Sequence, residues 1–131
     1  EELLKFSRRT QRQLDRWAAR YGYKEQPMEI LDYAKKGYHG GRYTCVNLQN
    51  SDTVEFRIFR GTLKTNTILA TLELVDRICD VAINLSDEEL RSLAWTTFVS
   101  GITEDCCLEL VRYLKERRLY VNEPVESEVE A

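Results

Sequence analysis

The feature that most constrains this chain is the stretch at residues 53–62, Thr-Val-Glu-Phe-Arg-Ile-Phe-Arg-Gly-Thr, in which apolar and polar side chains alternate. A period of two is typical of a β-strand with one buried and one open face. Val54 and Phe56 share the apolar face, and Glu55 and Arg57 lie side by side on the polar face. Such a pair is either a surface ion pair or part of a site for a cation and an anion, and the alternation alone favours the surface pair.

A second strand is predicted just before this one, because an Asn-Ser-Asp segment rich in turn residues separates two apolar runs. A three-residue loop sets Val46 opposite Phe56 and Asn47 opposite Glu55, so both strands agree on which face is apolar. A two-residue loop would mix the faces, which sheets resist. We therefore predict a β-hairpin at about residues 43–59 in this register.

The remaining segments have the periodicity of amphipathic helices. The predicted fold class is therefore α+β: a hairpin packed on several α-helices, in one domain over residues 1–121, followed by an acidic tail at 122–131. Ser86 with Glu89 forms a capping box, and Thr103 is expected to cap the last helix. The helices are predicted at residues 1–21, 27–36, 65–83, 86–100 and 103–119.

The predicted core joins the apolar hairpin face to the helices that follow it. Because a lone two-stranded hairpin is marginal in water, and its edges have no predicted partners, the chain is expected to be part of a larger sheet or to oligomerise. The residues expected to be buried together are Val46, Leu48, Val54, Phe56 and Ile58 on the hairpin and Leu69, Leu72, Val75 and Leu93 on the helices.

Composition excludes several classes of protein. The net charge of −3 and the pI of about 5.3 argue against a general nucleic-acid-binding surface, which needs a basic excess. No apolar run has the length of a membrane span. The four cysteines form no Cys-x-x-Cys pair and His39 is the one histidine, which makes a zinc site improbable. Without secretory features, we expect reduced thiols and a cytoplasmic location.

Two segments resemble a known family. Gly-Arg-Tyr-Thr-Cys-Val-Asn-Leu at residues 41–48 and the alternating stretch continued to Leu63 are similar to the C-terminal part of the amidoligase family. That family is a distant relative of glutamine synthetase and glutamate–cysteine ligase, and the resemblance extends more weakly through the helix at 65–83. It implies that the chain is a fragment of a glutamine-synthetase-like α+β fold.

The resemblance also implies an activity, an ATP- and Mg²⁺-dependent ligase that joins a carboxylate to an amine on small-molecule or peptide substrates. It implies that Glu55 binds Mg²⁺ near the nucleotide and that Arg57 contacts the transferred phosphoryl group. Arg42 is implied as a second phosphate contact and Asn47 as a positioning group of the cofactor site. Hard oxygen ligands and forked cations are the groups that phosphoryl transfer requires.

The chain also departs from the family. The superfamily's other metal-binding carboxylates and its His-containing strand lie upstream of this motif, where this chain has two basic helices. Glu55 alone cannot hold the magnesium ions of such a ligase, so we expect the chain to be inactive alone. The rest of a ligase domain, or a second copy of the chain, would complete the site. The alternative function is a non-catalytic α+β protein–protein interaction domain.

Overall fold

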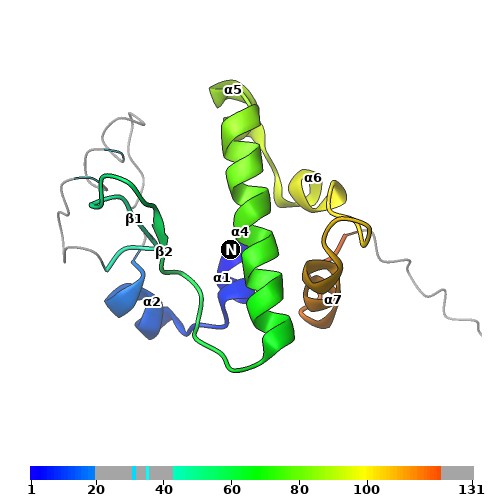
Figure 1. Ribbon diagram of the computed structural model, residues 1–131, viewed down its shortest axis with the longest axis horizontal. Coiled ribbons are helices and arrows are strands. Elements are labelled where there is room, and N and C mark those ends of the chain that lie inside the picture. Colours follow the sequence, from blue (N-terminus) through cyan, green and yellow to red (C-terminus); the bar gives the residue numbers. More distant parts are fainter. Residues whose placement is uncertain (20–30, 32–34, 36–42, 122–131) are drawn as a thin grey trace, which may run out of the picture. The chain divides into compact units, whose positions relative to one another are not determined.

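The computed structural model describes residues 1–19, 31, 35 and 43–121, and it contains α-helices and a small antiparallel hairpin, which confirms the α+β class (Figure 1). The chain divides after Gly61 into two compact units, called unit 1 and unit 2 below, and each is described by itself. The prediction of a single domain stays a prediction. Apart from Leu31 and Lys35, the predicted helix at 27–36 lies outside the described residues, as do Arg42, His39 and the tail at 122–131.

Unit 1 begins with two short helices where one helix at 1–21 was predicted, and that prediction is wrong. Helix α1, Glu2–Ser7, ends at Arg8, whose φ of 60° is left-handed. Helix α2, Gln11–Trp17, starts at Thr10, which forms a capping box with Gln13. This Thr-x-x-Gln motif offers the backbone a new helix start, so the chain turns at Arg8 instead of continuing the first helix.

The hairpin of unit 1 has the predicted register. Strand β1, Val46–Asn47, pairs antiparallel with β2, Glu55–Phe56, so that Val46 faces Phe56 and Asn47 faces Glu55. The regular ladder is much shorter than residues 43–59. The Arg57 N–H donates to the Cys45 carbonyl at 2.8 Å, which continues the pairing beyond the strands.

The burial of the hairpin differs from the prediction. Val54, expected in the core, is 55% exposed, and the other hairpin residues expected there, Val46, Leu48, Phe56 and Ile58, are only half-buried. Asn47, expected on the open face, is 4% exposed. The hairpin has a further neighbour: the segment after α2 forms a parallel bridge between Ala19 and Thr44, and the Cys45 N–H donates to the Ala19 carbonyl at 2.9 Å. One edge that seemed unpartnered in the sequence is therefore partly covered within unit 1.

Unit 2 is built on the packing of α4, Thr65–Asn84, against α7, Leu108–Glu116. The buried face of α4 consists of Thr67, Ala70 and Leu74, spaced three and four residues apart. The expectation that Leu69 and Leu72 are buried is wrong, since they are 42% and 60% exposed. The side chains of unit 2 with almost no exposure are Ala70, Leu74, Val99, Ile102, Leu110, Val111 and Leu114.

The predicted helix at 86–100 is interrupted. Helix α5, Asp87–Ser92, begins with the expected Ser86 and Glu89 capping box, but Leu93 and Ala94 are extended and α6 spans Trp95–Ser100. The Trp95 Nε1–H donates to the Leu119 carbonyl at 3.2 Å. This long-range hydrogen bond and the burial of Val99 fix α6 in an orientation that a continuous helix would not allow, so tertiary contacts override helix propensity.

The predicted helix at 103–119 begins later and ends earlier. Thr103 starts a separate turn, in which its carbonyl accepts from the N–H groups of Cys106 and Cys107, and α7 follows. The Glu73 carboxylate on α4 accepts from the Leu110 N–H at 2.6 Å and so replaces a local cap. The buried side chains of α7 and its N-cap include Cys107, Leu110, Val111 and Leu114.

Within the described part of the chain, no helix combines the length and the apolarity needed to cross a membrane.

Candidate active site

The polar face of the hairpin holds the predicted pair of charges in direct contact. Arg57 Nη1 donates to Glu55 Oε1 at 2.7 Å, and the two side chains are 18% and 36% exposed, respectively. Their spacing of two residues on a strand puts both on one face. The pair is therefore reachable from solvent but is held more firmly than a pair on a free surface.

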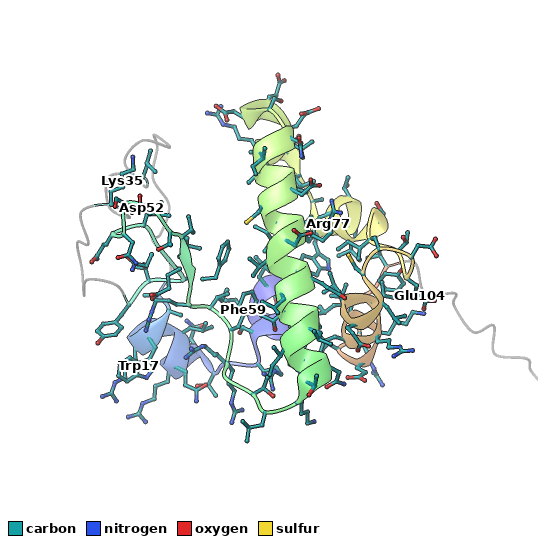
Figure 2. All side chains as sticks on the ribbon, viewed as in Figure 1. Trp17, Lys35, Asp52, Phe59, Arg77 and Glu104 are labelled. Carbon is teal, nitrogen blue, oxygen red and sulfur yellow. The ribbon has the colours of Figure 1, made fainter. Side chains whose placement is uncertain are left out.

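Arg57 is fixed by further groups of unit 1. Its Nε donates to the Trp17 carbonyl at the end of α2, at 3.3 Å, and its guanidinium carbon lies 5.2 Å from the centre of the Tyr43 ring. The Tyr43 ring packs edge-on against the Trp17 ring, with centroids 5.3 Å apart; Figure 2 labels Trp17 on α2. Because Nε and Nη1 are both engaged and the plane lies over a ring, the guanidinium has one defined orientation.

Arg57 Nη2 forms no hydrogen bond to a described residue, and neither does Glu55 Oε2. Arg57 Nη2 and Glu55 Oε2 are thus left for a ligand, while Nε, Nη1 and Oε1 already have partners. A donor and an acceptor of this kind can meet an anion and a cation at the same place.

Asn47 lies directly opposite Glu55 in the ladder and is almost fully buried. Its Oδ1 accepts from the Gln49 N–H at 3.2 Å, a local turn that shapes the start of the hairpin loop. The structure thus brings Asn47 and Glu55 together but gives the amide oxygen a backbone partner. The fourth predicted residue, Arg42, lies outside the described residues.

Arg9 is a residue of this region that the sequence reasoning did not single out. It follows the left-handed turn at Arg8, and its Nη2 donates to the Phe59 carbonyl at 3.1 Å. The pKa of Arg9 is lowered, first by burial of its guanidinium and then by the positive charge of Arg57. The signal in the sequence was only a pair of arginines, Arg8-Arg9, in a segment predicted to be a basic helix.

The described residues fit one ligand of a magnesium ion but do not complete its site. Among them, no group of three histidine, cysteine, aspartate or glutamate side chains is placed to hold a metal ion. Glu55 Oε2 offers one hard oxygen atom, and magnesium in nucleotide enzymes takes most of its other ligands from phosphates and water. The Glu73 carboxylate accepts a hydrogen bond from the Leu110 N–H, and Glu29 and Asp32 lie outside the described residues.

The fold and the site thus define an α+β protein that presents an oriented Glu-x-Arg pair on a hairpin. The sequence model of one family, described as "Putative amidoligase enzyme", matches residues 1–79 of the 131 residues. This match covers more than half of the chain and includes α1, α2, the hairpin and the first part of α4. The chain therefore belongs to the amidoligase family. No curated protein and no solved structure gives a significant match.

Proposed function

We propose that this chain contributes the Glu-x-Arg strand to the active site of an ATP- and Mg²⁺-dependent carboxylate–amine ligase. The observation that carries the proposal is the Glu55–Arg57 pair, oriented on one face of the hairpin with an oxygen and a donor left over. Its support is that the strand lies inside the region that matches the amidoligase family.

The proposed reaction has two steps. A carboxylate oxygen of the first substrate bonds to the γ-phosphorus of ATP, the bond from that phosphorus to the β–γ bridging oxygen breaks, and ADP leaves. The amine of the second substrate then bonds to the acyl carbon and loses a proton. The carbon–oxygen bond breaks at the same carbon, and phosphate leaves with the oxygen that the carboxylate first contributed.

Arg57 is proposed to bind the phosphoryl group that is transferred. Negative charge spreads over the phosphoryl oxygens during transfer, so a cation whose orientation is already fixed stabilises the transition state without reorganising. The hydrogen bonds from Nε to the Trp17 carbonyl and from Nη1 to Glu55 fix that orientation and leave Nη2 for a phosphoryl oxygen.

Glu55 is proposed to bind a magnesium ion through Oε2 while Oε1 keeps its hydrogen bond to Arg57. When bound, this ion would offset the negative charge of the nucleotide phosphates. Asn47 would support the strand that carries Glu55, since it lies opposite Glu55 in the ladder. Arg42 is kept as a second candidate phosphate contact.

The test is the path of the carboxylate oxygen. The native polypeptide that carries this sequence is incubated with Mg·ATP, a panel of carboxylates labelled with ¹⁸O in the carboxyl group, and a panel of amines. ADP and phosphate are then measured. A ligase of this class releases phosphate that contains the ¹⁸O label, and it does so only when both the carboxylate and the amine are present. Phosphate without label would contradict the acyl-phosphate route. A rate of ADP release that does not depend on added carboxylate would contradict the proposed ligase activity.

A variant pair tests the role of Arg57. Arg57→Lys keeps the charge but cannot offer a planar fork, and we expect it to lower kcat about a hundredfold while the circular dichroism spectrum stays unchanged. Arg12→Lys is the matched control, because Arg12 is exposed on α2 and its replacement should leave turnover unchanged. Unchanged turnover in Arg57→Lys would remove the role assigned to that residue.

The chain alone should bind Mg·ATP weakly or not at all and should form no amide bond. The reason is the number of ligands, since the described residues offer Glu55 as one carboxylate where such a site needs several. Isothermal titration of the chain with Mg·ATP measures this. Tight binding would show that the chain completes the site by itself, and tight binding of a protein partner with no ligation in any setting would favour the interaction domain.

A further inference from the structure

We propose that Arg9 is a second anion-binding residue, and that Arg9 and Arg57 together hold one group of the phosphate class next to Glu55. This inference rests on the proposed function, because that group would be the phosphoryl group in transfer. It adds a residue from the turn between α1 and α2 to a site otherwise built on the hairpin.

The first observation is that the turn carrying Arg9 is tied to the chain segment just after β2. The Arg60 N–H donates to the Ser7 carbonyl at 3.1 Å, and Arg8 Nη2 donates to the Arg60 carbonyl at 3.1 Å. The rings of Phe6 and Phe59 meet edge-on with centroids 5.8 Å apart. The position of Arg9 relative to the strand is therefore set by several contacts and does not depend on its own side chain.

The second observation is an unsatisfied donor. Arg9 Nη2 is engaged by the Phe59 carbonyl, two residues after Arg57, but the buried Nε of Arg9 has no hydrogen-bond acceptor among the described residues. A buried N–H of a charged group without an acceptor costs free energy, and nearly all such groups in native proteins have a partner. An oxygen atom of an anion would satisfy this guanidinium N–H.

The third observation is the balance of charge. Burial lowers the pKa of Arg9 most, and the positive charge of Arg57 is the second cause; Glu55 is the carboxylate that Arg57 contacts. Two like charges held close together in a partly buried place are unfavourable unless an anion joins them. Guanidinium groups match phosphate in charge and geometry, because each can offer two parallel N–H groups to two oxygens.

The experiment follows the arginine Nε–Hε resonances of the ¹⁵N-labelled 131-residue chain by NMR, with inorganic phosphate as the probe and acetate as the comparison. We expect phosphate to move the Arg9 and Arg57 resonances together along one saturating curve, while acetate moves neither at the same concentrations. The Arg9→Lys spectrum identifies the Arg9 resonance. Absence of a saturating phosphate shift at Arg9, or a shift with acetate and not with phosphate, would overturn the inference.

Variants supply a second measurement. Arg9→Gln should weaken phosphate binding, read at the Arg57 resonance, by about tenfold or more, whereas Arg12→Gln, which removes the same charge from an exposed position on α2, should change it less than about twofold. Equal effects of the two variants would show only general attraction and would overturn the paired site. The wild-type titration decides the question even if Arg9→Gln does not fold.

The inference and the proposed function can fail separately. Ligation that is lost in Arg57→Lys but unchanged in Arg9→Gln would overturn the role of Arg9 and leave the ligase standing. Saturating phosphate binding at both arginines, in a protein whose native polypeptide joins no carboxylate to an amine, would uphold the paired anion site and overturn the ligase.

Discussion

In both units, side-chain donors hold backbone carbonyls at helix ends and in loops, but the donors differ in chemistry. In unit 1 the donors are charged: Arg8, Arg9 and Arg57 donate to the carbonyls of Arg60, Phe59 and Trp17. In unit 2 the donors are the polar ends of two aromatic side chains, Trp95 to the Leu119 carbonyl and Tyr120 to the Ile102 carbonyl. The arginine donors of unit 1 add positive charge to their surroundings, whereas the aromatic donors of unit 2 add apolar surface.

This difference in donor chemistry suggests that unit 1 is suited to binding an anion and unit 2 to stabilising the fold. Guanidinium groups that support carbonyls in unit 1 are also available to an anion, so the same residues shape the site and give it its charge. Unit 2 has a core of aliphatic side chains with almost no exposure, such as Leu74, Leu110 and Leu114. We therefore expect substitutions in unit 1 to change binding more than stability, and substitutions in unit 2 to do the reverse.

The largest expected effect is in the core of unit 2. Leu110→Ala removes a fully buried side chain and should lower the free energy of unfolding by about 2–5 kcal/mol. Leu72→Ala, on the same unit but 60% exposed, is the control and should change it by less than about 0.5 kcal/mol. Urea unfolding in a Trp17→Phe background measures both, since Trp95 then reports on unit 2 alone. Equal losses in the two variants would contradict the assignment of the core.

The next effect depends on pH. Burial, and then a hydrogen bond with the Cys106 side chain, raise the pKa of Cys107 to about 12. The unfolded thiol loses its proton above about pH 8.5, so between that pH and about 12 the unfolded state binds fewer protons and stability falls as pH rises. Cys107 should contribute a loss of up to about 1.4 kcal/mol per pH unit in this window.

Cys107→Ala should be less stable at neutral pH, because it leaves a small gap, but its stability should decline less steeply above about pH 9. Urea midpoints of Trp95 fluorescence at several pH values give the two slopes. Identical slopes for the variant and the wild type would mean that the folded thiol ionises as readily as the unfolded one.

Sequence patterns predicted those features of the structure that depend on residues close together in the chain. The alternation around Phe56 gave the register of the hairpin, and the spacing of Ser86 and Glu89 gave a capping box that the structure contains. The pairing of Glu55 with Arg57 followed from a spacing of two residues on a strand. The register, the capping box and the ion pair each depend on residues that are close in sequence or are joined by a single turn.

Features that depend on distant segments could not be predicted in the same way. Helix α7 begins where it does because Glu73, 37 residues earlier in the chain, accepts from the Leu110 N–H. Arg9 approaches the site through a hydrogen bond to Phe59, 50 residues later. The break at Arg8 is a different case, since the Thr-x-x-Gln capping box that follows it is formed within one segment and can be read from the sequence.

The role of Glu73 can be tested directly, and the effect should be intermediate. Glu73→Ala leaves the Leu110 N–H without its acceptor and should cost about 1–2 kcal/mol. Glu73→Gln keeps an acceptor oxygen without the charge and should cost less. Hydrogen exchange at Leu110 reads the bond itself: its amide should lose protection in Glu73→Ala more than the Leu114 amide does. Equal changes at both amides would mean that Glu73 acts only through global stability.

The smallest expected effects concern two described residues other than glycine with left-handed backbone, Arg8 in unit 1 and Arg118 in unit 2, whose φ angles are 60° and 55°. Arg118 ends α7 in a Schellman turn, in which the Leu119 N–H donates to the Leu114 carbonyl at 2.8 Å. Its side chain makes no hydrogen bond to a described residue, so Arg118→Gly relieves the backbone and loses little. We expect a gain of about 0.5–1 kcal/mol.

Arg8→Gly relieves the same kind of strain but also removes the hydrogen bond from Nη2 to the Arg60 carbonyl. Because that bond helps to fix the turn that carries Arg9, we expect no gain, and we expect weaker phosphate binding at Arg9 and Arg57. Hydrogen exchange at Leu119 and Arg60, whose amides bond to Leu114 and Ser7, measures the two turns. Protection should rise about two- to fivefold at Leu119 in Arg118→Gly and should stay level or fall at Arg60 in Arg8→Gly. Equal gains at both amides would show that the arginine in unit 1 is as dispensable to its turn as the one in unit 2, and the contrast between the units would not hold.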